Sequence, residues 1–279
     1  MFTTIITTEE LADHLNDPDW AVVDCRFDLK NPDWGFTDYQ SGHIPGAIYA
    51  HLDKDLAGPV TEQTGRHPLP DVYAFARRLS EWGISNQTQV VVYDTQGGAY
   101  AARLWWMLRL VGNFAAAVLD GGYPKWQQEG RPTAKGVEHR PQAEFIPHPD
   151  WGLVADAVEV ERIRKDPAYS LIDARAPERF RGEVEPIDAI AGHIPGAVNR
   201  FHARNLSSSG TLLDPGTLRA QFAELIGSAD PRNVVVYCGS GVTSAHHVLA
   251  MVHAGLPTPR LYVGSWSEWI RDRNRPLSK

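Results

Sequence analysis

The sequence predicts an α/β protein made of two tandem copies of one domain, each with a central, mainly parallel β-sheet flanked by helices. Three observations support this prediction. Several short motifs occur twice in the same order. Runs of β-branched residues alternate with helical patterns in both halves. The length of 279 residues fits two domains of ordinary size.

Five pairs of motifs define the repeat, and the two members of each pair lie 143 to 150 residues apart. The pairs are SGHIPGAI (41–48) and AGHIPGAV (191–198), VVDCR (22–26) and LIDAR (171–175), VVVYD (90–94) and VVVYC (234–238), LDGGYPKW (119–126) and YVGSWSEW (262–269), and EGRP (129–132) and NRP (274–276). Between the copies, 131–151 is rich in proline and polar residues and has no sustained periodicity. We therefore predict an N-terminal domain over 1–135, a linker over 136–152 and a C-terminal domain over 153–279.

Strands and helices alternate within each copy. The β-branched and apolar runs predict strands at Ala21–Asp24, Val90–Tyr93 and Ala116–Leu119 in the first copy, and at Ser170–Asp173, Val234–Tyr237 and Arg260–Val263 in the second. Helical periodicity and end signals predict a capped helix starting near Thr7, and helices over Asp71–Trp82, Leu218–Ile226 and about Ser244–Ala254. Because the connections are helical, the sheets should be parallel.

Composition excludes several classes of protein. The net charge of −7 argues against a general partner in nucleic acid or an anionic membrane surface, and no apolar run is long enough to span a bilayer. The first residues lack the basic and apolar regions of a signal peptide, which favours the cytoplasm. The two cysteines, Cys25 and Cys238, give neither a disulfide framework nor a metal-binding pattern, so we expect no metal and no cofactor.

Cys238 is the strongest candidate for a catalytic residue. It follows the buried strand at Val234–Tyr237 and begins the loop Gly239–Thr243, which leads into a helix. Open α/β sheets place their sites at such strand ends. Backbone N–H groups of the loop and the helix dipole stabilise negative charge there, so we expect a thiolate of lowered pKa that could also carry a persulfide.

A buried structural cysteine is the alternative interpretation, because free cysteines are often buried. The repeat argues against it, since the matching position in the first copy is Asp94. A core position would not readily accept a carboxylate, whereas a polar loop position would. Cys25, which aligns with Ala174, is interpreted as small and structural.

Together with the two GHIPGA segments, the RFRG segment at Arg179–Gly182 and the GSWSEW segment at 264–269, this loop makes the whole chain resemble tandem-domain sulfurtransferases of the rhodanese family. The resemblance implies a non-catalytic N-terminal domain, with Asp94 in place of the cysteine. It also implies a catalytic C-terminal domain that carries sulfur on Cys238 between a small-molecule donor and an acceptor. The acceptor would be cyanide, a thiol or a thioredoxin-like protein.

The loop CGSGVT is similar to that of 3-mercaptopyruvate sulfurtransferases, while thiosulfate sulfurtransferases carry basic residues in it. A neutral loop favours 3-mercaptopyruvate, whose one carboxylate would be held by an arginine outside the loop. The resemblance implies that this arginine is Arg179, and that the loop binds substrate through Gly239, Ser240, Gly241, Val242 and Thr243. Such enzymes often have a second arginine soon after RFRG, but 183–188 reads EVEPID, so thiosulfate remains an alternative donor. A surface Arg179 paired with Glu178 or Glu183 is the other interpretation.

Some mercaptopyruvate enzymes are thought to use a Ser–His–Asp relay, and the resemblance extends this expectation to the present chain. Ser240 matches the serine. His43, from the first domain across a cleft, is the candidate histidine, and Asp33 matches the acid loosely. His193 repeats His43, so a structural turn residue is an equal alternative for His43.

A phosphatase and a non-catalytic sulfur carrier are the alternatives to an enzyme that transfers sulfur. A phosphatase of related fold would need an arginine six positions after the cysteine, where this chain has Ser244. A non-catalytic carrier would accept a persulfide from a partner protein without processing a free donor.

Overall fold

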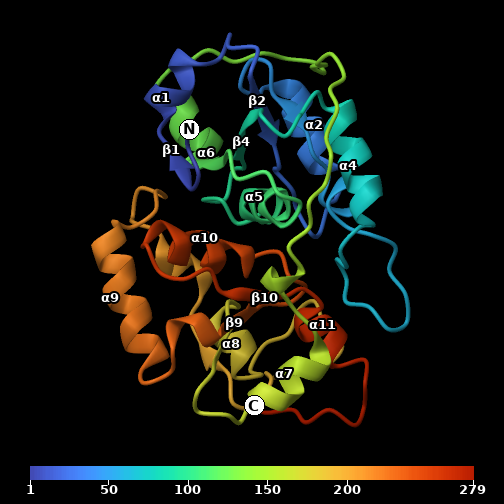
Figure 1. Ribbon diagram of the computed structural model, residues 1–279, viewed down its shortest axis with the longest axis vertical. Coiled ribbons are helices and arrows are strands. Elements are labelled where there is room, and N and C mark those ends of the chain that lie inside the picture. The colour runs from blue at the N-terminus through green and yellow to red at the C-terminus, as the bar shows by residue number, and fades with distance from the viewer. The chain divides into compact units, whose positions relative to one another are not determined.

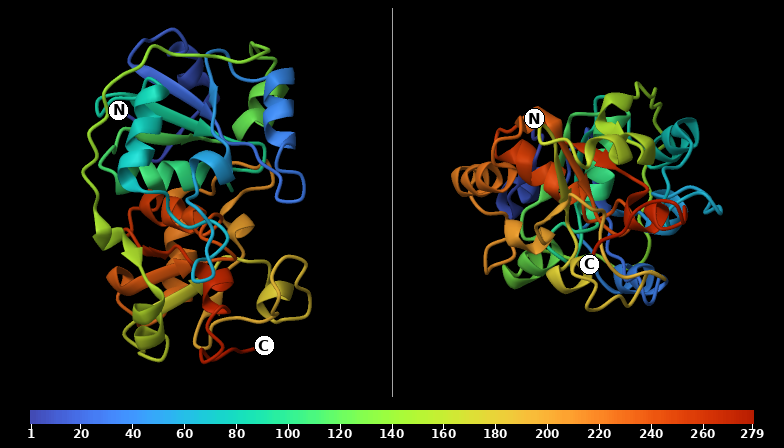
Figure 2. Two further views of the ribbon diagram at one scale, coloured as in Figure 1. Left: turned by 90° about the vertical axis from the view of Figure 1, so that its right-hand side faces the viewer. Right: turned by 90° about the horizontal axis from the view of Figure 1, so that it is seen from below.

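A computed structural model describes all residues from Met1 to Lys279 and divides them into two units. The first unit comprises Met1–Gly58, Leu69–Asp150 and Ser208–Leu212, and the second comprises Pro59–Pro68, Trp151–Ser207 and Leu213–Lys279. Each unit contains one five-stranded sheet in which all strands run parallel (Figures 1 and 2). The predicted fold class is therefore confirmed.

The two sheets have the same strand order. In the first unit the order is β1 (Ile5–Ile6), β5 (Ala116–Leu119), β4 (Gln89–Tyr93), β2 (Trp20–Asp24) and β3 (Ile48–Tyr49). In the second unit it is β6 (Val154–Ala155), β10 (Arg260–Tyr262), β9 (Val234–Tyr237), β7 (Ser170–Asp173) and β8 (Val198–Asn199). The strands predicted from the sequence are the long inner ones. Four two-residue strands, β1, β3, β6 and β8, were not predicted because two residues show no periodicity.

Helices cover the sheets in both units. The first unit has α1 (Thr8–Asp13), α2 (Trp34–Ser41), α3 (Leu52–Asp55), α4 (Val72–Glu81), α5 (Ala101–Leu110) and α6 (Gly122–Gln128). The second has α7 (Ala157–Ile163), α8 (Pro177–Phe180), α9 (Pro215–Ile226), α10 (Ala245–His253) and α11 (Ser265–Trp269), with 3-10 turns at Trp151–Leu153, His202–Asn205 and Pro231–Asn233. None of these helices has the length and hydropathy required to cross a bilayer.

The predicted helix ends agree with the local chemistry. Thr7 and Glu10 form a capping box at the start of α1, where each side chain accepts a hydrogen bond from the other residue's backbone N–H. Glycines with positive φ follow α4, α9 and α10, at Gly83, Gly227 and Gly255.

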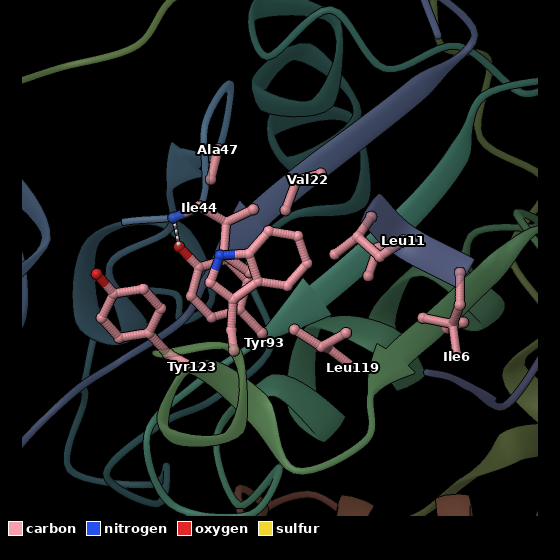
Figure 3. Close-up of a cluster of buried hydrophobic side chains, with 11 residues drawn as sticks. Ile6, Leu11, Val22, Ile44, Ala47, Tyr93, Leu119 and Tyr123 are labelled. Carbon is pink, nitrogen blue, oxygen red and sulfur yellow. Dashed lines mark hydrogen bonds between the residues drawn. The ribbon is translucent and has the colours of Figure 1, made fainter. Parts of the chain in front are cut away.

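The GHIPGA motif helps to anchor the strand that leads to the candidate loop in each unit. Tyr93, at the end of β4, accepts a hydrogen bond at its hydroxyl from the backbone N–H of Ile44, at 3.1 Å (Figure 3). Ile194 makes the same bond to Tyr237, at the end of β9, at 3.2 Å. In the first unit this contact lies in a core that also contains side chains of α1 and α6, among them Leu11 and Tyr123 (Figure 3).

Two chain segments depart from the predicted division into domains. Residues 136–150, placed in the linker, pack on the first unit, where Phe145 is buried and its N–H donates to Ser80 Oγ. Pro59–Pro68, placed in the first domain, belongs to the second unit. The backbone N–H of Arg66 donates to Ser267 Oγ in α11, and this light-blue segment lies beside the red helix in the left view of Figure 2.

Candidate active site

Cys238 lies where β9 ends and the loop to α10 begins. Its side chain is buried, with 2% of the residue exposed. Its backbone is fixed on both sides, because its N–H donates to Ser265 Oγ at 3.1 Å and its carbonyl accepts from the N–H of Trp266 at 3.0 Å. Ser265 is the one residue other than glycine with a positive φ, 54°. The loop therefore holds the sulfur in a defined position at the carboxyl end of a central strand.

Hydrogen-bond donors surround the sulfur of Cys238. Burial alone would raise the pKa of this thiol, but hydrogen bonds from the Ser244 and Thr243 hydroxyls and from the backbone N–H groups of Ser240 and Ser244 bring it below its usual value. The Ser244 hydroxyl lies 3.5 Å from the sulfur. The loop thus stabilises a thiolate without a cationic side chain inside it, and the same donors suit an anionic persulfide.

The tight loop requires glycine at Gly241. Its φ is +76°, and a Cβ there would lie 2.4 Å from the carbonyl oxygen of Val263. Val242 beside it is 4% exposed and closes the loop against solvent. The backbone can therefore adopt this tight loop only with glycine at position 241.

The equivalent loop of the first unit binds a negatively charged group. There Asp94 occupies the position of Cys238, and its carboxylate accepts four backbone hydrogen bonds of 2.7 to 2.9 Å, from Gln96, Gly98, Tyr100 and Ala101. Gln96 and Tyr100 are the repeat equivalents of Ser240 and Ser244, whose N–H groups bond the sulfur in the second unit. Both copies are therefore anion cradles, one occupied by a carboxylate and the other by a sulfur atom.

Arg179 lies beside the loop that holds Cys238, but its ion-pair partners differ from those expected. Its guanidinium pairs with Glu185, with N–O distances of 3.2 and 2.6 Å, and with Asp188 at 3.2 Å, rather than with Glu178 or Glu183. A Cβ at Gly239 would lie 3.7 Å from Arg179 Nη2. The arginine is thus beside the first loop residue after Cys238, and the interpretation as a surface ion pair with its sequence neighbours was wrong.

A second arginine reaches the same place from the segment Pro59–Pro68. Arg66 Nη2 lies 2.8 Å from the Cβ position of Gly239, and Arg66 Nη1 pairs with Asp188. Burial lowers the pKa of Arg66, whereas the charge of Cys238 acts in the opposite direction. A second guanidinium group therefore lies beside Gly239, and it comes from an earlier part of the chain than the RFRG segment.

The same segment brings a histidine to the loop. His67 Nδ1 lies 2.7 Å from Ser240 Oγ, and both residues are buried. Ser240 also contributes a backbone N–H to the sulfur of Cys238. A serine–histidine pair thus lies directly beside the nucleophile, with His67 as its histidine.

Comparison with known proteins identifies the architecture. The family model described as "Rhodanese-like domain" matches residues 7–129 and 156–272. The chain belongs to the rhodanese family. A Pseudomonas aeruginosa protein described as a probable 3-mercaptopyruvate sulfurtransferase is 45% identical over 98% of this chain and 97% of its own. A Mycobacterium tuberculosis protein, provisionally assigned as a thiosulfate sulfurtransferase, is 38% identical over 99% and 96%. The structure of 3-mercaptopyruvate sulfurtransferase from Leishmania major is 32% identical, with a TM-score of 0.84, and the match covers 96% of this chain and 74% of that one.

His43 has a structural position in the first rhodanese domain. It is fully buried, its Nδ1 lies 2.8 Å from the carbonyl of Tyr39, and its ring stacks on the Tyr39 ring. In the second rhodanese domain His193 repeats this arrangement against Phe180. Asp33 lies at the surface near Lys54. The histidine beside Ser240 is thus His67, whereas the contacts of His43 are those of a structural residue within its own unit.

The pKa of the remaining cysteine, Cys25, is shifted in the opposite direction from that of Cys238. Cys25 is as buried as Cys238, but burial and the nearby carboxylates of Asp24 and Asp94 raise its pKa well above the usual value. It is kept as a thiol, which agrees with the structural interpretation. No group of three or more His, Cys, Asp or Glu side chains is arranged to hold a metal ion.

One signal in the sequence could have pointed to Arg66 and His67. The spacing between repeated motifs falls from 150 to 144 residues between the GHIPGA pair and the VVVY pair. The first rhodanese domain therefore has six additional residues in this interval, which contains GRHPLP at 65–70. An insertion that contains a histidine and an arginine in one copy only is a reasonable candidate for a site contribution.

Proposed function

We propose that this protein transfers the sulfur atom of 3-mercaptopyruvate to a thiophilic acceptor through a persulfide on Cys238. The observation that carries the proposal is the cradle itself: a buried sulfur of lowered pKa, surrounded by hydroxyl and backbone donors, with two guanidinium groups beside Gly239. The relatives from Pseudomonas aeruginosa and Leishmania major, both described as acting on 3-mercaptopyruvate, support this choice of donor.

In the first half-reaction the Cys238 thiolate attacks the sulfur of the donor. A sulfur–sulfur bond forms, the carbon–sulfur bond breaks, and its electron pair leaves on carbon as the enolate of pyruvate. The proton of the donor thiol is transferred to that carbon, which becomes the methyl group of pyruvate. The enzyme then holds a persulfide anion, stabilised by the N–H groups that already bond the sulfur.

Ser240 and His67 are suited to move this proton. Their 2.7 Å contact forms a short relay next to the nucleophile, and histidine accepts and donates protons near neutral pH. In this proposal the pair takes the proton from the donor thiol and returns it to the enolate carbon. His67 therefore fills the role for which His43 was the sequence-based candidate.

Arg66 and Arg179 would orient the donor. A carboxylate binds favourably between two guanidinium groups, and both lie beside the residue that follows Cys238. In the second half-reaction a nucleophile such as cyanide, a small thiol or a reduced thioredoxin-like protein attacks the outer sulfur. The Cys238 thiolate is the leaving group, so the cycle closes without a cofactor. The first rhodanese domain, with Asp94 in its cradle, would not carry sulfur.

Thiosulfate is the second candidate donor. Two cations beside the loop could bind a dianion, and the Mycobacterium tuberculosis relative is provisionally assigned to this donor. Steady-state assays of kcat/KM with each donor and cyanide as acceptor distinguish the two. The proposal predicts a higher kcat/KM for 3-mercaptopyruvate, and a higher value for thiosulfate would overturn the donor assignment.

A further inference from the structure

Asp188 occupies the space between the two arginines at the mouth of the cradle. One of its carboxylate oxygens pairs with Arg66 Nη1 and the other lies 3.2 Å from Arg179 Nη2. Its side chain is 4% exposed. A carboxylate of the protein thus already holds the position in which two guanidinium groups would bind the carboxylate of a donor.

Glu185, the other acid of this group, has a different role. Its Oε1 accepts hydrogen bonds from the backbone N–H groups of Ile187 and Asp188, at 3.1 and 3.0 Å, and its Oε2 lies 3.4 Å from Arg175. Arg175 in turn binds the buried carboxylate of Asp173. Glu185 therefore pairs with Arg179 but also shapes its own loop and ties it to the sheet, whereas Asp188 forms ion pairs with both arginines at the site.

The formal charges of this group of four side chains cancel. Arg66 and Arg179 contribute two positive charges, and Glu185 and Asp188 contribute two negative ones. An incoming anion therefore meets arginines that are already neutralised, although the loop that holds Cys238 has no charged side chain. Each additional negative charge on the donor increases its repulsion from the two resident carboxylates.

We propose that Asp188 is a specificity-determining residue, a resident carboxylate that lowers the affinity of Arg66 and Arg179 for anions and does so more strongly for a doubly charged donor than for a singly charged one. This inference rests on the proposed function, because it concerns the donor subsite of the same reaction. It explains how a site with two arginines can favour the monoanion 3-mercaptopyruvate over the dianion thiosulfate.

The first test compares Asp188→Asn with wild type, using both donors. Removal of one negative charge should raise kcat/KM for 3-mercaptopyruvate about fivefold and for thiosulfate more, so that the thiosulfate to mercaptopyruvate ratio rises about fivefold. The increase should shrink at high salt. Asp188→Glu keeps the charge and should restore the wild-type ratio. Glu183→Gln is the matched control, because Glu183 lies in the same loop but is exposed and pairs with Arg181.

A second measurement does not depend on sulfur transfer. The alkylation rate of Cys238 is measured with iodoacetate, which is an anion, and with iodoacetamide, which is neutral. Asp188→Asn should raise the ratio of the two rates about fivefold, while Glu183→Gln leaves it unchanged. An unchanged ratio in Asp188→Asn, or an equal loss of kcat/KM for both donors, would overturn the inference. If the alkylation ratio rises but no donor yields a persulfide, the inference on Asp188 stands and the proposed function fails.

Discussion

The two cysteines of this chain are equally buried, yet their surroundings act on the two thiols in opposite directions. Around Cys25 the neighbouring charges are carboxylates, which add to the effect of burial. Around Cys238 the neighbours are hydrogen-bond donors, which outweigh burial. Reactivity at the residue scale is therefore set by the immediate donors and charges rather than by exposure.

The hydroxyl of Ser244 gives a direct test at this scale. Ser244→Ala removes the hydrogen bond that lowers the pKa of Cys238 most, so the pKa of this thiol should rise. Because the thiolate reacts and the thiol does not, the pH profile of alkylation by iodoacetamide should shift to higher pH in the variant. The rate should fall as pH drops through the pKa in both proteins. Coincident profiles for wild type and Ser244→Ala would show that the hydroxyl does not stabilise the thiolate.

The identity of single site residues was only partly predictable. Cys238 followed from a buried strand, a glycine-containing loop and the contrast with Asp94, all of which are local or repeated patterns. The partners of Arg179 were not predictable, because the path of the loop 183–190 decides which carboxylates reach it. Arg179 pairs with Glu185 and Asp188 rather than with its sequence neighbour Glu178.

At the scale of elements, the strand–loop–helix unit was the most predictable part of the structure. β9 and α10 have strong periodicity and a glycine at the helix end, so their positions were confirmed to within a residue or two. Short elements such as α8 and the two-residue strands depend on tertiary packing and had no comparable signal. The loop between β9 and α10 nonetheless has a steric requirement of its own, because position 241 has no room for a side chain.

Gly241→Ala tests whether this loop tolerates a side chain, and Gly210→Ala is the control for the cost of a positive φ alone. Both glycines have nearly the same φ, +76° and +78°, but a Cβ at Gly241 meets the carbonyl of Val263 and one at Gly210 meets nothing within 4 Å. Gly210→Ala should lower the free energy of unfolding by about 1 kcal/mol, and Gly241→Ala by about 3 kcal/mol with loss of activity. Urea denaturation measures both. Equal losses of stability would mean that the loop can shift to accept a side chain.

At the scale of the whole molecule, the site draws on residues that are far apart in the sequence. His67 and Ser240 are 173 positions apart, and the sequence repeat places them in different domains. A repeat predicts what two copies share, such as the structural histidines His43 and His193. It cannot by itself predict what an insertion in one copy contributes to the other unit.

The serine–histidine pair predicts a selective kinetic defect. His67→Ala should slow the donor half-reaction about a hundredfold, because that step requires a proton transfer, and should leave attack by cyanide on the persulfide almost unchanged. Rapid-mixing, single-turnover measurements separate the two steps. If the residues act as one relay, Ser240→Ala combined with His67→Ala should be little slower than either single variant. Equal slowing of both half-reactions in His67→Ala would indicate that this histidine only supports the loop.

The central claim is that Cys238 carries the transferred sulfur, and intact-protein mass spectrometry after incubation with 3-mercaptopyruvate alone tests it most directly. Wild type should gain the mass of one sulfur atom, peptide mapping should place it on Cys238, and added cyanide should remove it as thiocyanate. Cys238→Ser, in which Cys25 remains, should gain nothing. A sulfur adduct on Cys238→Ser, or thiocyanate formation by that variant at the wild-type rate, would contradict the account.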